Sequence, residues 1–206
     1  MKLYHHPFSS NARRAHMAAV HLGYAPELVL IDLSKGAQRN PEYLAINPNG
    51  KVPTLVDGEV VVWESLAIMT YLAQKTPGQT VYPTELVART HADQWLFWAS
   101  NHWGPTIGAL TFENMLKGMF GQGAPNEYSV AKAEGLLKGY AGTLDAQLAT
   151  SKFVTGDTLG LADLAIAAPL MYIGPAKLPV EGFTNIARWF AGIQQLEAWK
   201  ATEPQR

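Results

Sequence analysis

The spacing of apolar residues changes once along this chain of 206 residues, and that change divides the chain into two parts. In the first part short extended runs alternate with helical ones; the extended runs cover residues 2–5, 27–31, 54–56 and 60–63. From residue 85 onward, apolar side chains recur only at three- and four-residue steps, which is the period of a helix. The sequence therefore predicts an α/β domain over residues 1–76, a linker over 77–84 and an all-helical domain over 85–206.

Five helices are predicted in the second part, over residues 85–118, 127–149, 161–173, 183–194 and 196–202. The second shows the clearest pattern, because Leu137, Leu144 and Leu148 share one face of it. Pro105 lies inside the first and is expected to kink it, since proline lacks the N–H that the helix ladder needs.

The composition limits the partners and the chemistry. Net charge is −1 and like charges do not cluster, so nothing indicates nucleic acid or a membrane surface as a partner. The absence of cysteine excludes disulfides, zinc thiolates and a cysteine nucleophile. The six histidines are scattered, and His5-His6 lacks the spacing of metal ligands, so no metal site is predicted. The N-terminal residues form no apolar targeting segment, and we expect a cytoplasmic protein.

The segment NPNGKVPTLVDG places Pro53 at the mouth of a predicted strand, where a backbone N–H would normally pair. If the Val52–Pro53 bond is cis, the amide and carbonyl of Val52 point away from the sheet and can pair with an extended peptide. A trans proline at the start of an edge strand is the simpler interpretation. The residues alone leave both open.

Two predicted helices begin with polar side chains. PFSSNARRA places Ser9, Ser10 and Asn11 at the first start, and WESLAI places Glu64 and Ser65 at the second. Helix capping alone accounts for all of them. A helix N-terminus also attracts anions, because its N–H groups are free and its dipole is positive there. Glu64 with Ser65 would in addition suit the zwitterionic end of an amino acid.

These segments together carry a resemblance to a known family. PFSSNARRA, PEYLAINPNGKVPTLVDG and VWESLAIMTYLA resemble the N-terminal domain of glutathione transferases, and FVTGDTLGLADLAIAAPL resembles the signature of their helical domain. The chain is most similar to the serine-type branch, with its theta, delta and phi-like classes and their bacterial relatives. The resemblance implies an α/β thioredoxin-like N-terminal domain (βαβαββα) followed by an all-α C-terminal domain, and a cis Val52–Pro53 bond.

The resemblance also implies a role for each polar position. Ser9 is expected to direct its hydroxyl at the glutathione sulfur, with Ser10 as the rival donor and Asn11 as a second donor. The glutathione contacts implied are Ser9, Gln38, Lys51, Val52, Pro53, Glu64 and Ser65. In this set the Val52 backbone pairs with the cysteinyl residue, and Glu64 and Ser65 hold the γ-glutamyl end. Gln38 and Lys51 meet the glycine carboxylate, for which Arg39 is an alternative.

The second substrate is expected in a pocket between the domains, under the first helix of the helical part. The predicted pocket walls are Phe8, Asn101, Trp103 and Phe112, although aromatic residues at helical spacing belong more often to a core. Arg13 and Arg14 are interpreted as solvated surface charges. A homodimer is implied, with Asp93 as a candidate contact to glutathione across the subunit boundary; a charged fraction of 16%, against about 25% in typical domains, agrees with a partly covered surface.

The function implied is that of a glutathione transferase of the detoxification kind. It would stabilise the glutathione thiolate and direct it at a small, largely apolar electrophile, with glutathione as co-substrate and no metal. Two alternatives stay open: a glutathione-dependent disulfide or peroxide reductase, and a non-catalytic module that binds ligands or a protein on the same fold. One departure from the family pattern is Gly160, which stands where Ser or Thr usually caps a helix; Asp163 is still expected to accept a bond from its N–H.

Overall fold

The computed structural model describes residues 1–204, which form two compact units. The first unit contains residues 1–82 together with residues 194–204, and the second contains residues 83–193. The sequence had placed the whole of 85–206 in the helical domain. The C-terminal segment instead belongs to the first unit, where the short helix α10 (Glu197–Lys200) packs on α1 (Ser10–His21).

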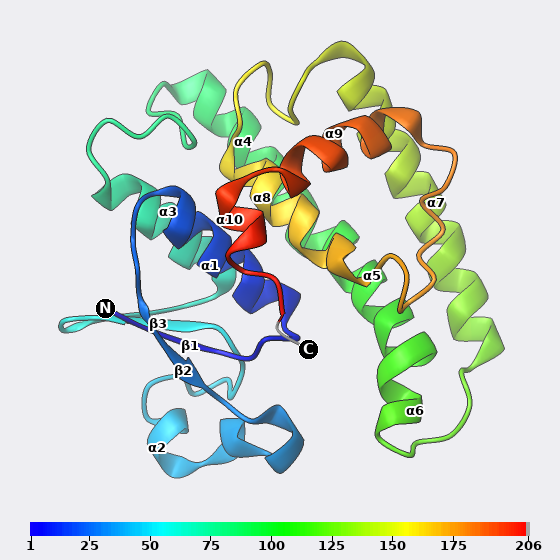
Figure 1. Cartoon of the computed structure of the whole chain (residues 1–206), viewed down its shortest axis with the longest axis horizontal. Coiled ribbons are helices and arrows are strands. Elements are labelled where there is room, and N and C mark those ends of the chain that lie inside the picture. Colours follow the sequence, from blue (N-terminus) through cyan, green and yellow to red (C-terminus); the bar gives the residue numbers. More distant parts are fainter. Residues whose placement is uncertain (205–206) are drawn as a thin grey trace. The chain divides into compact units, whose positions relative to one another are not determined.

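A four-stranded mixed sheet forms the centre of the first unit (Figure 1). Its strands are β1 (Lys2–His5), β2 (Glu27–Leu30), β3 (Thr54–Asp57) and β4 (Val60–Trp63), in the spatial order β2-β1-β3-β4. β1 pairs in parallel with β2 and antiparallel with β3, and β3 and β4 form an antiparallel hairpin across the Asp57-Gly58 turn. All four strands agree with the predicted extended runs to within one residue at each end.

Helices cover both faces of this sheet. Figure 1 shows α1 and α3 (Ser65–Lys75) on one side and α2 (Pro41–Leu44), with the short 3₁₀ turns η1 (Leu33–Lys35) and η2 (Ala37–Arg39), on the other. The core under α1 and α3 consists of Leu3, Ala15, Ala19, Leu55, Ile68 and Leu72, each no more than 1% exposed. Leu3 and Leu55 are directly opposite in the β1–β3 register, so they present one apolar surface to both helices.

Arg13 and Arg14 are buried, and the prediction that they are solvated is wrong. The Arg13 guanidinium lies over the Trp199 ring, 3.7 Å from its centroid, and its Nη2 donates to the Trp199 carbonyl at 3.1 Å. Only 5% of Arg13 and 7% of Arg14 is exposed. The sequence shows these charges but not their acceptors, which lie far away along the chain.

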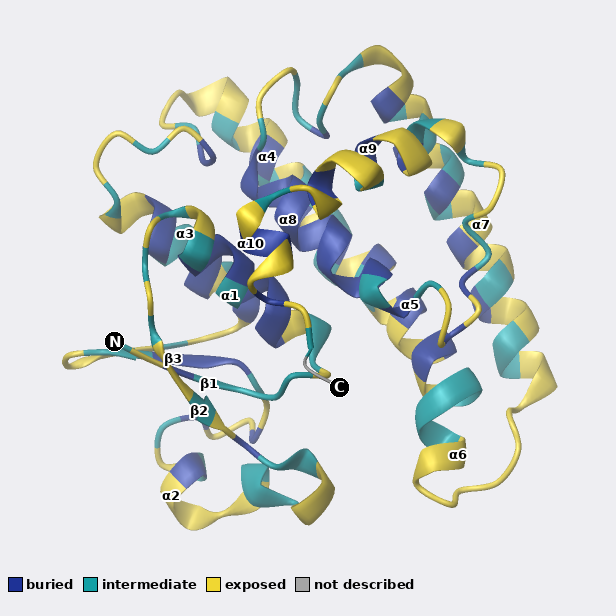
Figure 2. Cartoon of the chain, in the orientation of Figure 1, coloured by how far each residue is buried: buried dark blue, intermediate teal, exposed yellow. Residues whose placement is uncertain are grey.

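The second unit is entirely helical apart from one isolated bridge between Phe153 and Gly156. Its elements are α4 (Leu86–Trp98), η3 (Ala99–Trp103), α5 (Gly104–Thr111), η4 (Phe112–Leu116), α6 (Lys117–Met119), α7 (Glu127–Thr150), α8 (Leu161–Ala167), η5 (Ala168–Tyr172) and α9 (Thr184–Gln194). Helix α8 is buried within this unit (Figure 2): all seven residues of α8 are buried. No helix within residues 1–204 is long and apolar enough to cross a membrane.

The first predicted helix, 85–118, is continuous but contains two π-turns, η3 and η4. η3 ends at Trp103, and the next residue, Gly104, which precedes Pro105, donates its N–H to the Ala99 carbonyl across the wider turn. A π-turn accommodates proline, because the ladder bond that proline cannot make is already interrupted there. A Cβ on Gly104 would lie 2.9 Å from that carbonyl oxygen, which explains the glycine.

Asp163 holds the start of α8 and the loop before it. Its Oδ2 accepts from the Gly160 N–H at 2.8 Å, as the sequence predicted, and its Oδ1 accepts from the Val154 N–H at 2.9 Å and the Trp189 Nε1–H at 2.7 Å. Burial raises the pKa of Asp163 to about 6, against the opposing effect of these hydrogen bonds. One fully buried carboxylate thus joins three segments of the helical unit.

Replacement of Asp163 by asparagine is expected to lower the free energy of unfolding by about 2–4 kcal/mol, because one N–H then faces an amide donor. Asp157→Asn is the matched control, since Asp157 is exposed in the same loop and should change stability by less than about 0.5 kcal/mol. Urea unfolding followed by circular dichroism measures both. Equal stability of the two variants would contradict the assigned role.

Candidate active site

Three of the predicted site segments lie beyond the same end of the neighbouring strands β1, β3 and β4, because of the strand register. Tyr4 of β1 lies opposite Thr54 of β3, which lies opposite Trp63 of β4. Neighbouring strands in this row run in opposite directions. Ser9 therefore follows the end of β1, Val52 precedes the start of β3 and Glu64 follows the end of β4. All three lie beyond the same end of this row of strands.

Ser9 is the N-cap of α1. Its Oγ accepts a hydrogen bond from the Ala12 N–H at 3.2 Å, and its own N–H donates to the His6 carbonyl at 2.9 Å. A hydroxyl that accepts in this way keeps its O–H available as a donor to another group. The first turn of α1 contains no acidic residue, so no side-chain carboxylate in that turn competes for the positive end of the helix. Capping and anion binding are therefore compatible here.

Phe8 and Asn11, which lie near Ser9 in the sequence, are more accessible than Ser9. Phe8 is 45% exposed and lies against the His6 ring, with centroids 5.8 Å apart. Asn11 is exposed, and Ser10 is half-buried at the first helical position.

The Val52–Pro53 bond is cis, as the resemblance implied. Pro53 is buried and Val52 is half-buried. Within residues 1–204, neither the amide nor the carbonyl of Val52 makes a hydrogen bond, whereas pairing of β3 begins at Thr54. The Val52 backbone can therefore pair with an extended peptide.

Two residues that the sequence analysis did not single out hold this segment from behind. The Tyr43 hydroxyl donates to the Lys51 carbonyl at 2.6 Å, and Asn47 Nδ2 donates to the same oxygen at 2.8 Å. Both side chains also bond to Thr54 Oγ1, each at 2.9 Å. Tyr43 and Asn47 are buried, and burial raises the pKa of the Tyr43 phenol. The only available signal was their place in PEYLAINPNGKVP, which identifies the motif but not their partners.

Gly50 allows the loop that contains Gln38 to lie close to the loop that contains Lys51. Gly50 has a φ of +57°, and a Cβ there would lie 2.9 Å from the Gln38 carbonyl and 3.1 Å from an Arg39 guanidinium nitrogen. Lys51 and Arg39 are exposed cations at this junction. The Gln38 Oε1 atom is buried without a hydrogen-bond partner among the described residues.

At the start of α3, Ser65 is 2% exposed and Glu64 is exposed with a φ of +69°. Arg14 Nε donates to Ser65 Oγ at 2.7 Å. Burial lowers the pKa of Arg14 to about 10, and the nearby Glu64 carboxylate opposes that shift. Arg14 is thus a member of this cluster that the sequence analysis had assigned to the surface.

The predicted pocket wall is only partly supported. Trp103 is a core residue, so its assignment to a pocket wall is wrong: it is fully buried, stacks on Trp98 with centroids 5.5 Å apart, and donates its Nε1–H to the Ile166 carbonyl. Asn101 is exposed and Phe112 is 38% exposed, so both remain predictions.

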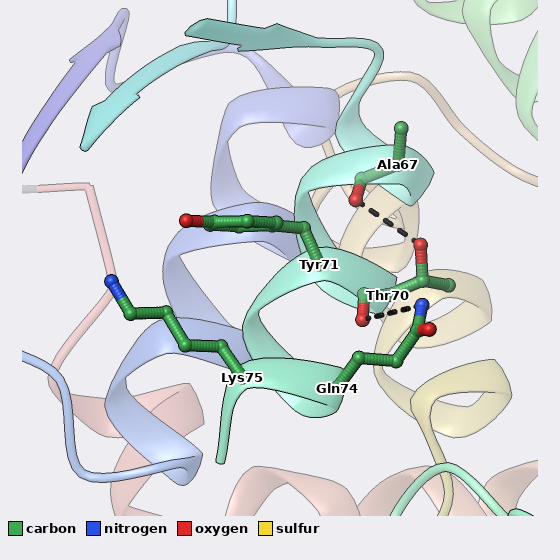
Figure 3. A pocket seen from close by; sticks show the side chains of 5 residues that line it. All are labelled: Ala67, Thr70, Tyr71, Gln74 and Lys75. Carbon is green, nitrogen blue, oxygen red and sulfur yellow. Dashed lines mark hydrogen bonds between the residues drawn. The ribbon is translucent and has the colours of Figure 1, made fainter. Parts of the chain in front are cut away.

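A separate hollow of about 390 Å³ follows the outer face of α3 and contains none of the predicted site residues. Figure 3 shows that its lining comes from that helix alone, through Ala67, Thr70, Tyr71, Gln74 and Lys75. Two of these side chains bond within the helix, Thr70 to the Ala67 carbonyl and Gln74 to the Thr70 carbonyl. The described part of the chain holds no group of three or more side chains that could bind a metal.

Comparison with known proteins places the chain in a family. The family models for the glutathione S-transferase N-terminal and C-terminal domains match residues 1–74 and 105–197. Glutathione S-transferase F10 of Arabidopsis thaliana is 34% identical over 200 residues, which cover 94% of this chain and 92% of that protein. Glutathione S-transferase 3 of Zea mays is 33% identical over 208 residues, which cover 98% and 92%.

Solved structures agree with the sequence comparison. Glutathione transferase F7 from Populus trichocarpa has a TM-score of 0.90 at 27% identity, over 98% of this chain and 96% of that one. Glutathione S-transferase-I bound with lactoylglutathione has a TM-score of 0.88 at 26% identity, over 98% and 97%.

Fold and sequence together define a thioredoxin-like glutathione-binding unit followed by an all-helical one. The chain belongs to the glutathione S-transferase family. It is a glutathione transferase that uses glutathione as co-substrate, and these relatives favour neither the reductase nor the non-catalytic module. The relatives named here are plant phi-class glutathione S-transferases, one of the classes to which the sequence was compared.

Gly50→Ala is expected to destabilise the first unit more than Gly58→Ala. Both glycines have positive φ, which costs an alanine about 1–2 kcal/mol, but a Cβ at Gly58 meets no atom within 4 Å. At Gly50 the contact with the Gln38 carbonyl should add about 1–3 kcal/mol. Chemical unfolding of both variants measures the difference, and equal losses would show that the contact does not constrain the loop.

Proposed function

We propose that Ser9 activates glutathione by donating its hydroxyl hydrogen to the thiolate. The observation that carries this is the bond from the Ala12 N–H to Ser9 Oγ. Because Ser9 accepts in this bond, its single O–H can still donate to an anion at the positive end of α1. A free thiol has a pKa of about 8.5, and lowering it by two units takes about 2.7 kcal/mol. A hydroxyl bond to an anion contributes about 1.5–3 kcal/mol and the helix dipole about 0.3–1 kcal/mol. No metal or general base is required.

The rest of glutathione is proposed to bind along the ends of strands β1, β3 and β4. The amide and carbonyl of Val52, beside Pro53, pair with the cysteinyl residue as an added strand. The γ-glutamyl end meets the Ser65 hydroxyl for its carboxylate and Glu64 for its ammonium group. Because Ser65 Oγ already accepts from Arg14, its O–H remains to donate to the ligand, which makes Arg14 a positioning residue.

The glycine carboxylate of glutathione is proposed to lie at the Gln38–Lys51 junction. Lys51 contributes a flexible positive charge, and Arg39 beside Gly50 contributes a second. Gln38 is the nearby neutral group: its amide nitrogen can donate to a carboxylate, and its Oε1 atom is buried without a partner in the described chain. The exposed amide of Asn11, two residues after Ser9, is the proposed second donor to the sulfur.

The second substrate is proposed to be a small, largely apolar electrophile, which the thiolate attacks by substitution or addition to give a thioether. Phe8 precedes Ser9 directly and exposes nearly half of its surface, so it offers an apolar wall beside the sulfur position.

Ser9→Ala should lower kcat for a chlorinated nitroaromatic by about 10- to 100-fold near pH 6.5, the equivalent of one hydrogen bond to an anion. The dissociation constant of glutathione should change by less than about threefold. Ultraviolet absorbance of the bound thiolate, titrated with pH, should show its pKa rising toward the free value of about 8.5.

Ser10→Ala is the matched control, because Ser10 is the adjacent hydroxyl at the start of the same helix. It should leave both kcat and the thiol pKa close to those of the unmodified protein. The opposite result, loss with Ser10→Ala and none with Ser9→Ala, would transfer the role to Ser10.

We also propose a cytoplasmic homodimer. β4 is an edge strand of the sheet, and it exposes Val60, Val61 and Trp63 by 44%, 42% and 42%. Apolar edge strands left open tend to associate, so proteins cover them. A second copy of the chain is the proposed cover.

Sedimentation equilibrium is expected to give a mass of about 45 kDa, twice the 22.5 kDa of one chain. Trp63→Glu should shift the protein toward the monomer, because it introduces a charge into the proposed contact. Leu30→Glu, on the opposite edge strand β2 and 58% exposed, should leave the dimer intact. A single-chain mass for the unmodified protein would refute the dimer.

A further inference from the structure

Asn49 and Gly50 form the only Asn-Gly pair in the sequence. Asn49 is exposed and Gly50 is buried. An asparagine that precedes glycine loses its side-chain amide more readily than other asparagines, because glycine has no side chain to shield its backbone nitrogen and its backbone is permissive. The pair stands directly before Lys51, which is proposed to meet the glycine carboxylate of glutathione. A chemically labile residue therefore borders the proposed substrate site.

The fold gives a structural reason for both members of this pair. Gly50 has a φ of +57°, and a Cβ there would lie 2.9 Å from the Gln38 carbonyl oxygen, so a larger residue is excluded. Asn49 donates its backbone N–H and its Nδ2–H to the Oδ1 atom of Asn47, at 3.1 and 3.2 Å. Asn47 is itself 2% exposed. The folded loop thus retains an Asn-Gly pair that is labile in a flexible chain.

The closed turn restrains the reaction. The Gly50 N–H donates to the Asn47 carbonyl at 2.9 Å, which closes a turn over residues 47–50 with proline and glycine at favoured positions. In this turn the Gly50 nitrogen and the Asn49 amide are both hydrogen-bonded to Asn47. Attack of the Gly50 nitrogen on the Asn49 side chain requires both bonds to break. Deamidation is therefore expected from the open turn.

The reaction is a ring closure followed by hydrolysis. The Gly50 backbone nitrogen attacks the Asn49 side-chain carbonyl carbon, a C–N bond forms, and the bond from that carbon to Nδ2 breaks. The amide leaves as ammonia, together with the hydrogen that the Gly50 nitrogen gives up, and a cyclic imide remains. Water then opens the imide at either carbonyl, which gives aspartate or isoaspartate. Water is the only co-reactant, and nothing is oxidised or reduced.

Loss of the amide changes the charge and the hydrogen bonding of the turn. The product carries a carboxylate near Lys51 and Arg39, the two cations proposed to bind the glycine carboxylate, and this charge opposes that of the ligand. The side chain also loses its donor to Asn47 Oδ1, so two acceptor oxygens face each other. Asn47 is the residue whose Nδ2 holds the Lys51 carbonyl at 2.8 Å. Isoaspartate in addition lengthens the main chain before Gly50.

We propose that Asn49 is a deamidation site whose modification lowers the affinity for glutathione, and that bound glutathione protects it. This inference rests on the proposed position of glutathione at Val52 and Lys51. A ligand that pairs with these residues stabilises the closed turn, and a ligand that binds one of two states reduces the population of the other. Enzyme that is left without substrate is therefore the form that loses its affinity.

The modification is tested by incubating the full chain at mildly alkaline pH and weighing its peptides by mass spectrometry. The Asn49 peptide should gain the mass that accompanies exchange of an amide for an acid. Asn126 is the internal control, because it is exposed but precedes Glu127, and its peptide should keep its mass. Glutathione at about 100 times its Kd should slow the change at Asn49 by at least about tenfold.

The consequence for binding is tested by calorimetric titration of glutathione into three variants. Asn49→Asp reproduces one product and should raise Kd by about tenfold, with a smaller effect at high salt. Asn126→Asp adds the same charge at a helix N-cap, where aspartate serves as well as asparagine, and should change Kd by less than about twofold. Asn49→Gln keeps a neutral amide that cyclises more slowly, so it should retain its affinity through the incubation.

Three results overturn the proposal. The first is an Asn49 peptide that keeps its mass in the folded protein while the same segment deamidates in urea-unfolded protein. The second is a rate that glutathione leaves unchanged, and the third is equal glutathione affinity of Asn49→Asp and Asn126→Asp. Failure of freshly prepared, unmodified protein to bind glutathione refutes the proposed glutathione site and with it the loss of affinity, whereas the mass of the Asn49 peptide still decides whether that residue is modified.

Discussion

The burial of two adjacent guanidinium groups is the constraint that organises the glutathione-binding unit. A buried charge is costly unless it is hydrogen-bonded, so each arginine must find an acceptor inside the fold. Arg14 finds Ser65, 51 residues away at the start of α3, and Arg13 finds the Trp199 carbonyl and ring, 186 residues away. These bonds fix α1 against α3 and against the C-terminal segment, and with it the position of the helix start that carries Ser9.

The site itself is built mainly from backbone and helix ends. The start of α1, the unpaired Val52 and the start of α3 lie beyond one row of the sheet because the register aligns Tyr4, Thr54 and Trp63. Tyr43 and Asn47 hold the Lys51 carbonyl from the interior, which fixes the peptide that leads to Val52. Preorganisation of this kind lowers the entropy that binding would otherwise cost.

Local signals predicted the elements well where they were strong. The Asp57-Gly58 turn predicted the β3–β4 hairpin, and the heptad-like leucines predicted α7, because both depend on neighbours in sequence. Contacts between residues far apart along the chain could not be predicted from the sequence. Trp103 stood in an aromatic run, which belongs to a core more often than to a pocket, and its complete burial and its bond to the Ile166 carbonyl place it in the core. The prediction that Arg13 and Arg14 lie at the surface was wrong for the same reason.

The sequence by itself determined the two-part architecture, the family and the candidate residues Ser9, Val52, Glu64 and Ser65, because motifs and periodicity are local properties of the chain. Only the tertiary structure decided which groups support them: Arg14 behind Ser65, Tyr43 and Asn47 behind Lys51, and the return of the C-terminal segment onto α1. The physical reason is that a side chain's burial and its hydrogen-bond partner depend on what other segments bring to it, and the order of residues alone does not contain that information.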